Sequence, residues 1–96
     1  MIVSFASQCA EDLYHGSSTK YSRSIPAAIW SVTQRKLDMI NAAHQLLDLR
    51  VPPGNHLEKL IGNYAGFHSI RINNQYRIVF RWSNGHAHNV DIVDYH

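Results

Sequence analysis

The spacing of hydrophobic positions changes about halfway along the chain. Between residues 29 and 47, apolar side chains recur at steps of three to five residues, which is typical of a helix with one buried face. These positions are Ile29, Val32, Leu37, Ile40, Ala43 and Leu47. They follow Ser24-Ile25-Pro26, and proline is well tolerated in the first turn of a helix. The pattern predicts a helix that runs to about Asp48, with or without an interruption.

From Phe67 onward the spacing becomes two, as in strands that bury one face. Asn73-Asn74 and Ser83-Asn84-Gly85 supply the turns between three such segments, the last of which runs from His88 to Tyr95. The segments place these apolar residues on one face: Ile70, Ile72, Tyr76, Ile78, Phe80, Val90 and Ile92. We therefore expect a meander of three consecutive antiparallel strands with one face to cover.

The first half of the chain predicts the cover. Ile2 to Phe5 suggests a short first strand, and Ser7 can cap a short helix that ends at His15-Gly16. Pro52-Pro53-Gly54-Asn55 then ends the helical pattern before the sheet begins. Because an exposed apolar sheet face would be unstable, the helices must pack on it. The sequence predicts an α+β fold, an antiparallel sheet meander packed against two N-terminal helices, in a single domain over residues 1–96.

Composition restricts the class of protein. The 96 residues, 45% hydrophobic and 17% charged, suit one small globular domain and exclude a two-domain enzyme with a separate cofactor domain. A single cysteine, Cys9, allows no internal disulfide and no paired-cysteine zinc site, which fits a reducing compartment. The sequence shows no basic leader and no apolar run of about 18 residues. We therefore expect a cytoplasmic protein that makes no contact with a membrane.

The basic charge is concentrated in one segment. The net charge is only +2, but the stretch between Glu58 and Asp91 contains four basic residues and no acidic one. These basic residues are Lys59, Arg71, Arg77 and Arg81. In the predicted register the three arginines lie on the uncovered sheet face, with Tyr95 at its edge. Such a face attracts phosphates, although a merely solvated sheet face would have the same composition.

Several spaced blocks in the second half of the chain resemble the HigB-type toxins of the RelE superfamily. The blocks are Leu49 to Glu58, Gly66 to Asn73, Gln75 to Trp82 and the terminal Asp94-Tyr95-His96. The predicted order of strand, two helices and meander is also similar to that family. The resemblance implies a RelE-like microbial RNase-type fold and the toxin component of a type II toxin-antitoxin system.

The resemblance also implies an activity and partners. The implied activity is mRNA cleavage in the ribosomal A site, which arrests translation and needs no cofactor. The implied partner is a HigA-like antitoxin that bears a helix-turn-helix, so operator DNA is bound only through the antitoxin. RNA cleavage of this kind requires that the 2′-hydroxyl lose a proton, that the phosphorane charge be stabilised and that the leaving 5′ oxygen be protonated. None of these steps requires a metal ion.

The resemblance assigns candidate residues to these steps. Arg77 matches the arginine of the family's aromatic-Arg-Ile block, and a guanidinium offers permanently charged, forked donors to phosphate oxygens. Asp94, Tyr95 and His96 match the terminal motif as candidate acids and bases, and the sequence leaves open which is which. Each of them also has a plain structural interpretation at a strand or chain end. The candidates for holding the RNA backbone are Lys36, Lys59, Arg71 and Arg81.

The sequence departs from the family in one block. Related chains often have Leu-Lys-Gly-Asp where this chain has Leu60-Ile61-Gly62-Asn63, so a cation and a carboxylate are missing. Either Ile61 leaves a phosphate contact unfilled, or it packs against the sheet. Two alternative functions stay open on the same fold. One is a gyrase-directed ParE-like toxin, against which the terminal Asp94-Tyr95-His96 argues, and the other is a non-catalytic module that binds nucleic acid or protein, which Ile61 and Asn63 would suit.

The seven histidines raise the question of a metal site. His86 and His88 are two residues apart on one strand, a spacing that suits two ligands. The sequence offers no identifiable third ligand beside them, and both flank a turn where polar residues are expected. No metal site is therefore predicted.

Overall fold

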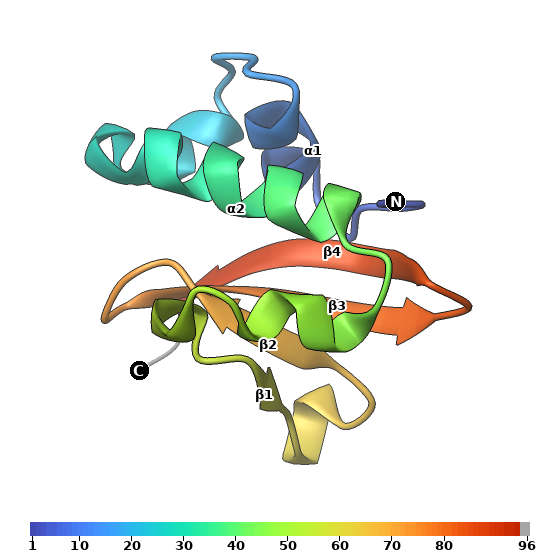
Figure 1. Cartoon of the computed structure of the whole chain (residues 1–96). Helices are drawn as coiled ribbons and strands as arrows, with labels where there is room; N and C mark the ends of the chain where they lie inside the picture. Colours follow the sequence, from blue (N-terminus) through green and yellow to red (C-terminus); the bar gives the residue numbers. More distant parts are fainter. Residues whose placement is uncertain (95–96) are drawn as a thin grey trace.

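Two helices pack against one face of a four-stranded antiparallel sheet (Figure 1). The computed structural model describes residues 1–94. The helices are α1 (Gln8–Tyr14) and α2 (Trp30–Ala42), and the strands are β1 (Glu58–Lys59), β2 (His68–Arg71), β3 (Tyr76–Ser83) and β4 (His86–Asp94). The strands are hydrogen-bonded in the order β1-β2-β3-β4. The predicted α+β fold, with a meander covered by two N-terminal helices, is confirmed. None of the helices in residues 1–94 is long and apolar enough to span a membrane.

Helix α1 begins and ends where the sequence predicts. The Ser7 hydroxyl accepts a hydrogen bond from the backbone N–H of Ala10 at 3.1 Å and so caps the first turn. At the other end His15 is the capping residue, and Gly16 adopts a left-handed conformation with φ of 72°. Glycine takes up this conformation without the penalty that a side chain would add.

Helix α2 is shorter than the periodicity predicts. It ends at Ala42, so a continuous helix to about Asp48 is wrong and the helical pattern is interrupted there. The Asp48 carboxylate accepts hydrogen bonds from the backbone N–H groups of His44 and Gln45, both at 3.0 Å. These bonds start a separate 3-10 turn over Leu46–Arg50, because they bind N–H groups that a continuing helix would use.

The burial of the predicted apolar stripe agrees with the shorter helix. Leu37 and Ile40 of α2 are completely buried, whereas Leu47, which the stripe also included, is 58% exposed. At its start, α2 is preceded by a 3-10 turn over Ala27–Ile29, so the helix proper begins later than Pro26.

The meander forms in the expected register. Ile70 of β2 faces Ile78 of β3, which in turn faces Ile92 of β4. Asn84 and Gly85 both have positive φ, 53° and 78°, as a tight two-residue hairpin turn requires. Side chains of the sheet and of both helices form one core, which includes Leu13, Leu37, Ile40, Ile70, Ile78, Phe80 and Val90.

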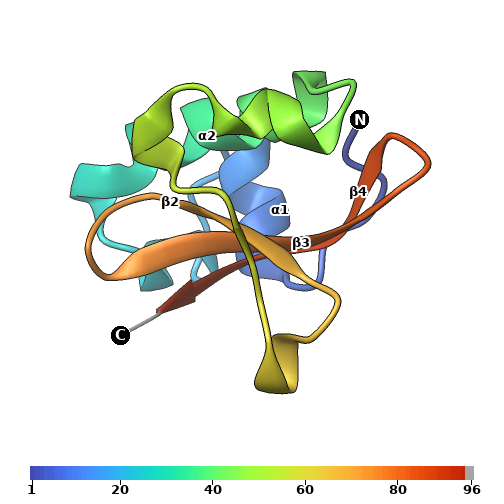
Figure 2. The same ribbon diagram turned by 60° about the horizontal axis from the view of Figure 1, so that its bottom comes forward.

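Two elements differ from the prediction at the sheet edges. The segment Ile2 to Phe5 is not a strand but makes two isolated parallel bridges to Ala87 and Val90 of β4. At the opposite edge β1 is an additional strand that the sequence did not predict. It has only two residues, both exposed, and so produces no alternating hydrophobic pattern. Figure 2 shows the chain after α2 crossing from the helix layer to the sheet, where it forms β1.

A bulge in β4 adjusts which residues face each other near the second turn. The register of β3 with β4 shifts between Val79 and Arg81, at the point where Asn89 has a φ of 54°. The extra residue brings both Ala87 and Val90 into the core. As a result Arg81 lies directly opposite His88.

Candidate active site

Three arginines lie on the sheet face opposite the helices, which we call the arginine face. Arg71 on β2 and Arg77 on β3 are direct cross-strand partners. Arg81 is four residues further along β3, and side chains four residues apart on a strand point to the same side. The predicted alternation of β2 and β3 therefore brings these cations together on one side of the sheet.

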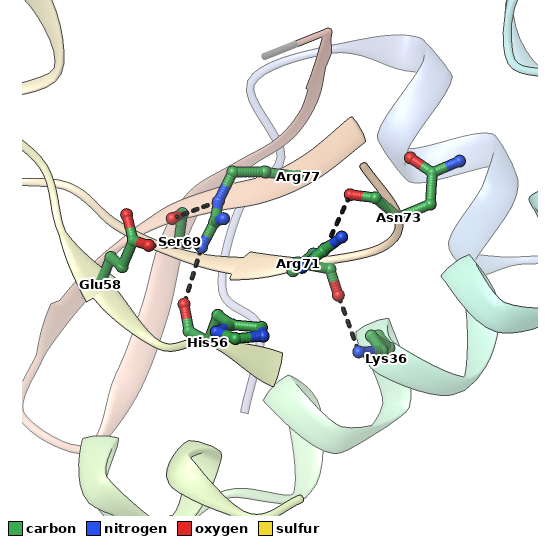
Figure 3. Close-up of polar contacts among 7 residues, drawn as sticks. All are labelled: Lys36, His56, Glu58, Ser69, Arg71, Asn73 and Arg77. Atoms are coloured by element: carbon green, nitrogen blue, oxygen red, sulfur yellow. Dashed lines mark hydrogen bonds and ion pairs between the residues drawn. The ribbon is translucent and has the colours of Figure 1, made fainter. Parts of the chain in front are cut away.

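The guanidinium of Arg77 is held in a fixed orientation (Figure 3). Its Nε donates a hydrogen bond to the Ser69 hydroxyl at 2.8 Å, and its Nη2 donates to the backbone carbonyl of His56 at 2.7 Å. The Glu58 carboxylate is 3.8 Å from Nη2. Arg77 is only 9% exposed, so the expectation of an uncovered face is wrong at this residue. A buried cation needs such partners, because an unpaired charge would be costly to remove from water.

These partners come from β1, β2 and the turn before β1. Ser69 is opposite Val79, one position diagonal from Arg77, and Glu58 is the next cross-strand neighbour of Ser69. His56 has a left-handed φ of 46° immediately after the 3-10 turn Pro53–Asn55, and its carbonyl accepts from Arg77. The short strand β1 thus supplies one of the groups around the guanidinium, and the turn that leads into it supplies another.

Sequence reasoning did not select Ser69 or Glu58 as site residues. The signal for Ser69 was present, since alternation places it on the polar face beside Arg71. Glu58 had a weaker signal, as the acidic residue that borders the basic segment. No sequence signal pointed to the carbonyl of His56, because every residue has a backbone carbonyl and the sequence does not show which one a side chain will contact.

The side chain of Arg71 is directed toward the turn between β2 and β3. Its Nε donates to the backbone carbonyl of Asn73 at 3.2 Å, and its Nη2 donates to the side-chain oxygen of Asn74. Arg71 is partly exposed, so it is more accessible to a ligand than Arg77.

Lys36 lies inside the protein between α2 and the sheet (Figure 3). It is 8% exposed, and its Nζ donates to the Asn55 side-chain oxygen at 2.8 Å and to the Arg71 carbonyl at 2.7 Å. Burial lowers the pKa of the Lys36 ammonium, and repulsion from nearby arginines, Arg35 foremost, lowers it further. The two hydrogen bonds favour a structural role, and RNA contact by Lys36 stays a prediction.

Lys59 and Arg81 are the exposed cations of the arginine face and its border. The Cζ atom of Arg81 is 4.5 Å from the centre of the Phe67 ring. Lys59 is the cross-strand partner of His68. Burial lowers the pKa of His68, and the charge of Lys59 lowers it further, so this imidazole is largely neutral at neutral pH.

The terminal motif is described only as far as Asp94. The Gln75 side-chain amide donates to Asp94 Oδ2 at 3.0 Å, and Asp94 is the cross-strand partner of Tyr76. Alternation therefore places Asp94 on the side of Tyr76 rather than on that of Arg77. Tyr95 and His96 lie outside the described residues. The acid and base roles of all three stay predictions.

Ile61 does not pack against the sheet. It is 88% exposed, so the interpretation of this residue as part of the core is wrong. Its neighbour Asn63 is also exposed. Within residues 1–94 the structure contains no group of three or more His, Cys, Asp and Glu side chains close enough to hold a metal ion.

The arrangement suits recognition of a phosphate rather than a neutral ligand. An oriented guanidinium lies between an exposed arginine and a partly exposed one on the same face. The guanidinium is permanently charged and carries more N–H donors than the two that Ser69 and His56 engage, and the flanking cations add a local positive field.

Comparison with known proteins gives consistent matches. A family model described as HigB-like toxin, the RelE-like toxin of the type II toxin-antitoxin system HigB, matches residues 3–96. The chain is 43% identical to Toxin HigB-1 of Vibrio cholerae over 89 residues, which are 93% of this chain and 92% of that protein. It is 44% identical to an uncharacterized protein of Haemophilus influenzae over 66 residues, 69% of this chain and 65% of that one.

Solved structures with a similar fold are toxin-antitoxin complexes. One is the heterotetrameric YoeB-YefM complex from Staphylococcus aureus, with a TM-score of 0.61 and 22% identity over 100% of this chain and 98% of that one. A second YoeB-YefM complex from the same organism gives a TM-score of 0.58 at 21% identity, with the same coverage. At this level of identity the likeness concerns the fold.

Proposed function

Since the chain belongs to the HigB-like family of RelE-like toxins of type II toxin-antitoxin systems, we propose that it cleaves mRNA on the ribosome and thereby stops translation. Toxins of the RelE and HigB families are mRNA-cleaving RNases. The observation that supports the same activity here is the buried, doubly held guanidinium of Arg77 on a basic face.

Arg77 stabilises the phosphorane in this proposal. As the 2′-oxygen attacks, negative charge grows on the non-bridging phosphate oxygens, and a donor that is already oriented stabilises that charge without reorganising. Ser69 and His56 supply the orientation, because they hold two separate nitrogens of the guanidinium. Glu58 balances the charge of Arg77 in the free protein.

The proton transfers belong to the terminal motif. In this proposal one of Tyr95 and His96 accepts the proton of the 2′-hydroxyl, and the other protonates the leaving 5′ oxygen. Asp94, which alternation places on the side of Tyr76, orients its neighbours in the motif. These side chains and Arg77 can supply every required step, so the proposed reaction is independent of metal ions.

The remaining cations position the RNA. Lys59, Arg71 and Arg81 contact backbone phosphates and the ribosome, because such contacts need charge but no particular proton chemistry. The proposed location is the ribosomal A site in the cytoplasm. As a type II toxin, the protein has an antitoxin partner. We propose that this partner is HigA-like, bears a helix-turn-helix and provides the only link to operator DNA.

Single-turnover cleavage on programmed ribosomes tests this proposal, with the 5′ ends of the products mapped. Wild-type protein should cleave ribosome-bound mRNA and barely cleave the same RNA when it is free, because few catalytic groups must rely on positioning. Arg77→Lys keeps the charge but loses the fork, and we expect a loss of about 100- to 1,000-fold in rate. Arg71→Ala should lose less, and Arg23→Ala, an exposed position on the helix side, should lose nothing.

Melting curves of each variant separate loss of activity from loss of folding. Equal losses for Arg77→Lys and Arg71→Ala would contradict the role of Arg77. Intact mRNA together with inhibition of gyrase supercoiling would support the ParE-like alternative, and no effect in either assay would support the non-catalytic module.

A further inference from the structure

The guanidinium of Arg81 lies against Phe67 and Gly66. Its Cζ lies 4.5 Å from the centre of the Phe67 ring. Gly66 has a φ of 89°, and a Cβ atom at this position would be 2.9 Å from Arg81 Nη1. The left-handed backbone favours glycine, and a Cβ atom here would displace the end of the Arg81 side chain, so glycine leaves space for the guanidinium beside Phe67.

The Phe67 ring also packs against a second aromatic ring. Tyr64 and Phe67 pack edge to face, with ring centres 5.6 Å apart and planes at 84°. Both aromatic residues are partly buried, whereas Arg81 is exposed. Within residues 1–94 no carboxylate lies within ion-pair distance of Arg81. The planar cation is thus supported by an aromatic ring and accessible to a ligand.

This assembly is on the same side of the sheet as Arg77. The two arginines are four residues apart on β3, which corresponds to about 13 Å along the strand. A group bound at Arg81 would therefore lie beside the phosphate at Arg77 and not on it. A lysine would suffice to contact a backbone phosphate there, but a guanidinium stacked on an aromatic ring also offers a flat surface.

We propose that Arg81, supported by Phe67 and Gly66, stacks against a nucleobase of the mRNA next to the cleaved linkage. This inference rests on the proposed function and adds a base-binding subsite to it. Unstacked RNA bases bind preferentially on aromatic rings and on arginine planes. Because every base has a π-face, the subsite accepts any of the four bases and fixes position rather than sequence.

The test combines Arg81→Lys with a set of mRNAs that each lack one base near the cleavage site. Lysine keeps the charge and removes the plane, and Arg23→Lys on the helix side is the matched control. Wild-type protein should lose about tenfold in single-turnover rate when one particular base is missing. Arg81→Lys should cleave intact mRNA about tenfold more slowly than wild type does. Removal of that base should not lower the rate of Arg81→Lys any further. Arg23→Lys should behave as wild type.

Equal sensitivity of wild type and Arg81→Lys to the missing base would overturn the proposal. So would a variant that binds and cleaves RNA normally but binds the antitoxin weakly, since Arg81 would then contact a protein. Fluorescence anisotropy with the same RNAs as short oligonucleotides measures binding without cleavage. If wild type binds the RNA that lacks the base more weakly, Arg81→Lys does not, and neither protein cleaves mRNA, the base-binding subsite is retained and the endonuclease is rejected. If mRNA is cleaved but wild type and Arg81→Lys respond equally to the missing base, only the subsite is rejected.

Discussion

Ile61 is a large apolar side chain that lies almost entirely in water. It is 88% exposed in the loop between β1 and β2, near the exposed cation Lys59. An isoleucine in this position contributes little to the core, so replacing it should not open a cavity. The position can therefore carry a charged group without loss of core packing.

We expect Ile61→Lys to fold as stably as wild type and to cleave mRNA faster. Surface substitutions usually change the free energy of unfolding by less than about 0.5 kcal/mol. A charged hydrogen bond to phosphate that strengthens in the transition state would raise the single-turnover rate about tenfold or more. Ile61→Ser, which removes the apolar group without adding charge, is the control. A lysine variant that melts earlier, or cleaves no faster, would contradict this expectation.

The sequence predicted part of the candidate site and missed the rest for physical reasons. Alternation correctly placed Arg77 and Arg71 on the polar face, because side-chain direction in a strand is local. The burial of Arg77 was not predictable in this way. It depends on the carbonyl of His56, a backbone group 21 residues away in the sequence. Long-range contacts with the main chain leave no pattern in the side chains.

At the level of elements, Asn55 connects α2 to the loop that leads into β1. It is completely buried, and its Nδ2 donates to the carbonyls of Leu49 at 3.1 Å and Val51 at 3.4 Å. Its Oδ1 accepts the ammonium of Lys36 at 2.8 Å. Since His56 is the next residue, the same amide also fixes the carbonyl that holds Arg77.

We expect Asn55→Ala to lower the free energy of unfolding by about 2 to 4 kcal/mol, because it leaves two buried carbonyls and part of a buried ammonium unsatisfied. Cleavage at a temperature where the variant is folded should also slow, since His56 loses its anchor. Denaturant unfolding and single-turnover cleavage measure the two effects. The matched control is Asn63→Ala at an exposed position. Similar unfolding energies for the two variants would reject this role of Asn55.

The turn after α2 should make stability depend on pH through Asp48. Hydrogen bonds from the backbone N–H groups of Gln45 and His44 lower the pKa of Asp48 below its ordinary value of 3.8. The folded state thus favours the charged form, and this stabilisation is present above pH 3.8 and is lost as the pH falls through the lower folded-state value. Asp48→Asn should melt earlier than wild type near neutral pH.

The difference in melting temperature between wild type and Asp48→Asn should therefore shrink in acid. Thermal melts from about pH 6 to about pH 2.5 would follow it, and the comparison cancels the titration of other carboxylates. A difference that stays constant over this range would mean that the two hydrogen bonds do not favour the carboxylate.

The same turn explains where prediction of the elements failed. The apolar spacing continues to Leu47. Periodicity describes only the apolar positions, so it does not show that the Asp48 carboxylate binds the N–H groups of His44 and Gln45. The strand β1 was missed because two residues are too few to show a period. The longer meander was predictable, because its buried face repeats over three strands.

At the level of the whole molecule, the basic segment faces one way and the helices the other. Binding of RNA to the arginine face should therefore depend strongly on salt. For single-stranded nucleic acid, each phosphate contact contributes a slope of about −0.7 to a plot of log affinity against log salt concentration. Arg71→Ala should reduce the slope by about this amount, whereas Arg23→Ala should leave it unchanged. Anisotropy titrations of a short RNA at several salt concentrations measure the slopes, and equal slopes for all proteins would place the RNA elsewhere.

The two edges of the sheet determine whether a strand from another molecule could pair with it. Along the first half of β4, the N–H groups of Val3 and Ala6 donate to the carbonyls of Ala87 and Val90, both at 2.8 Å, so that edge is already occupied. The opposite edge ends in β1, whose two residues, Glu58 and Lys59, are both charged and exposed. Long apolar edges serve as templates for strand addition between molecules, and short or charged edges oppose it. Within residues 1–94, the two edges of the sheet therefore offer little template for strand addition between molecules.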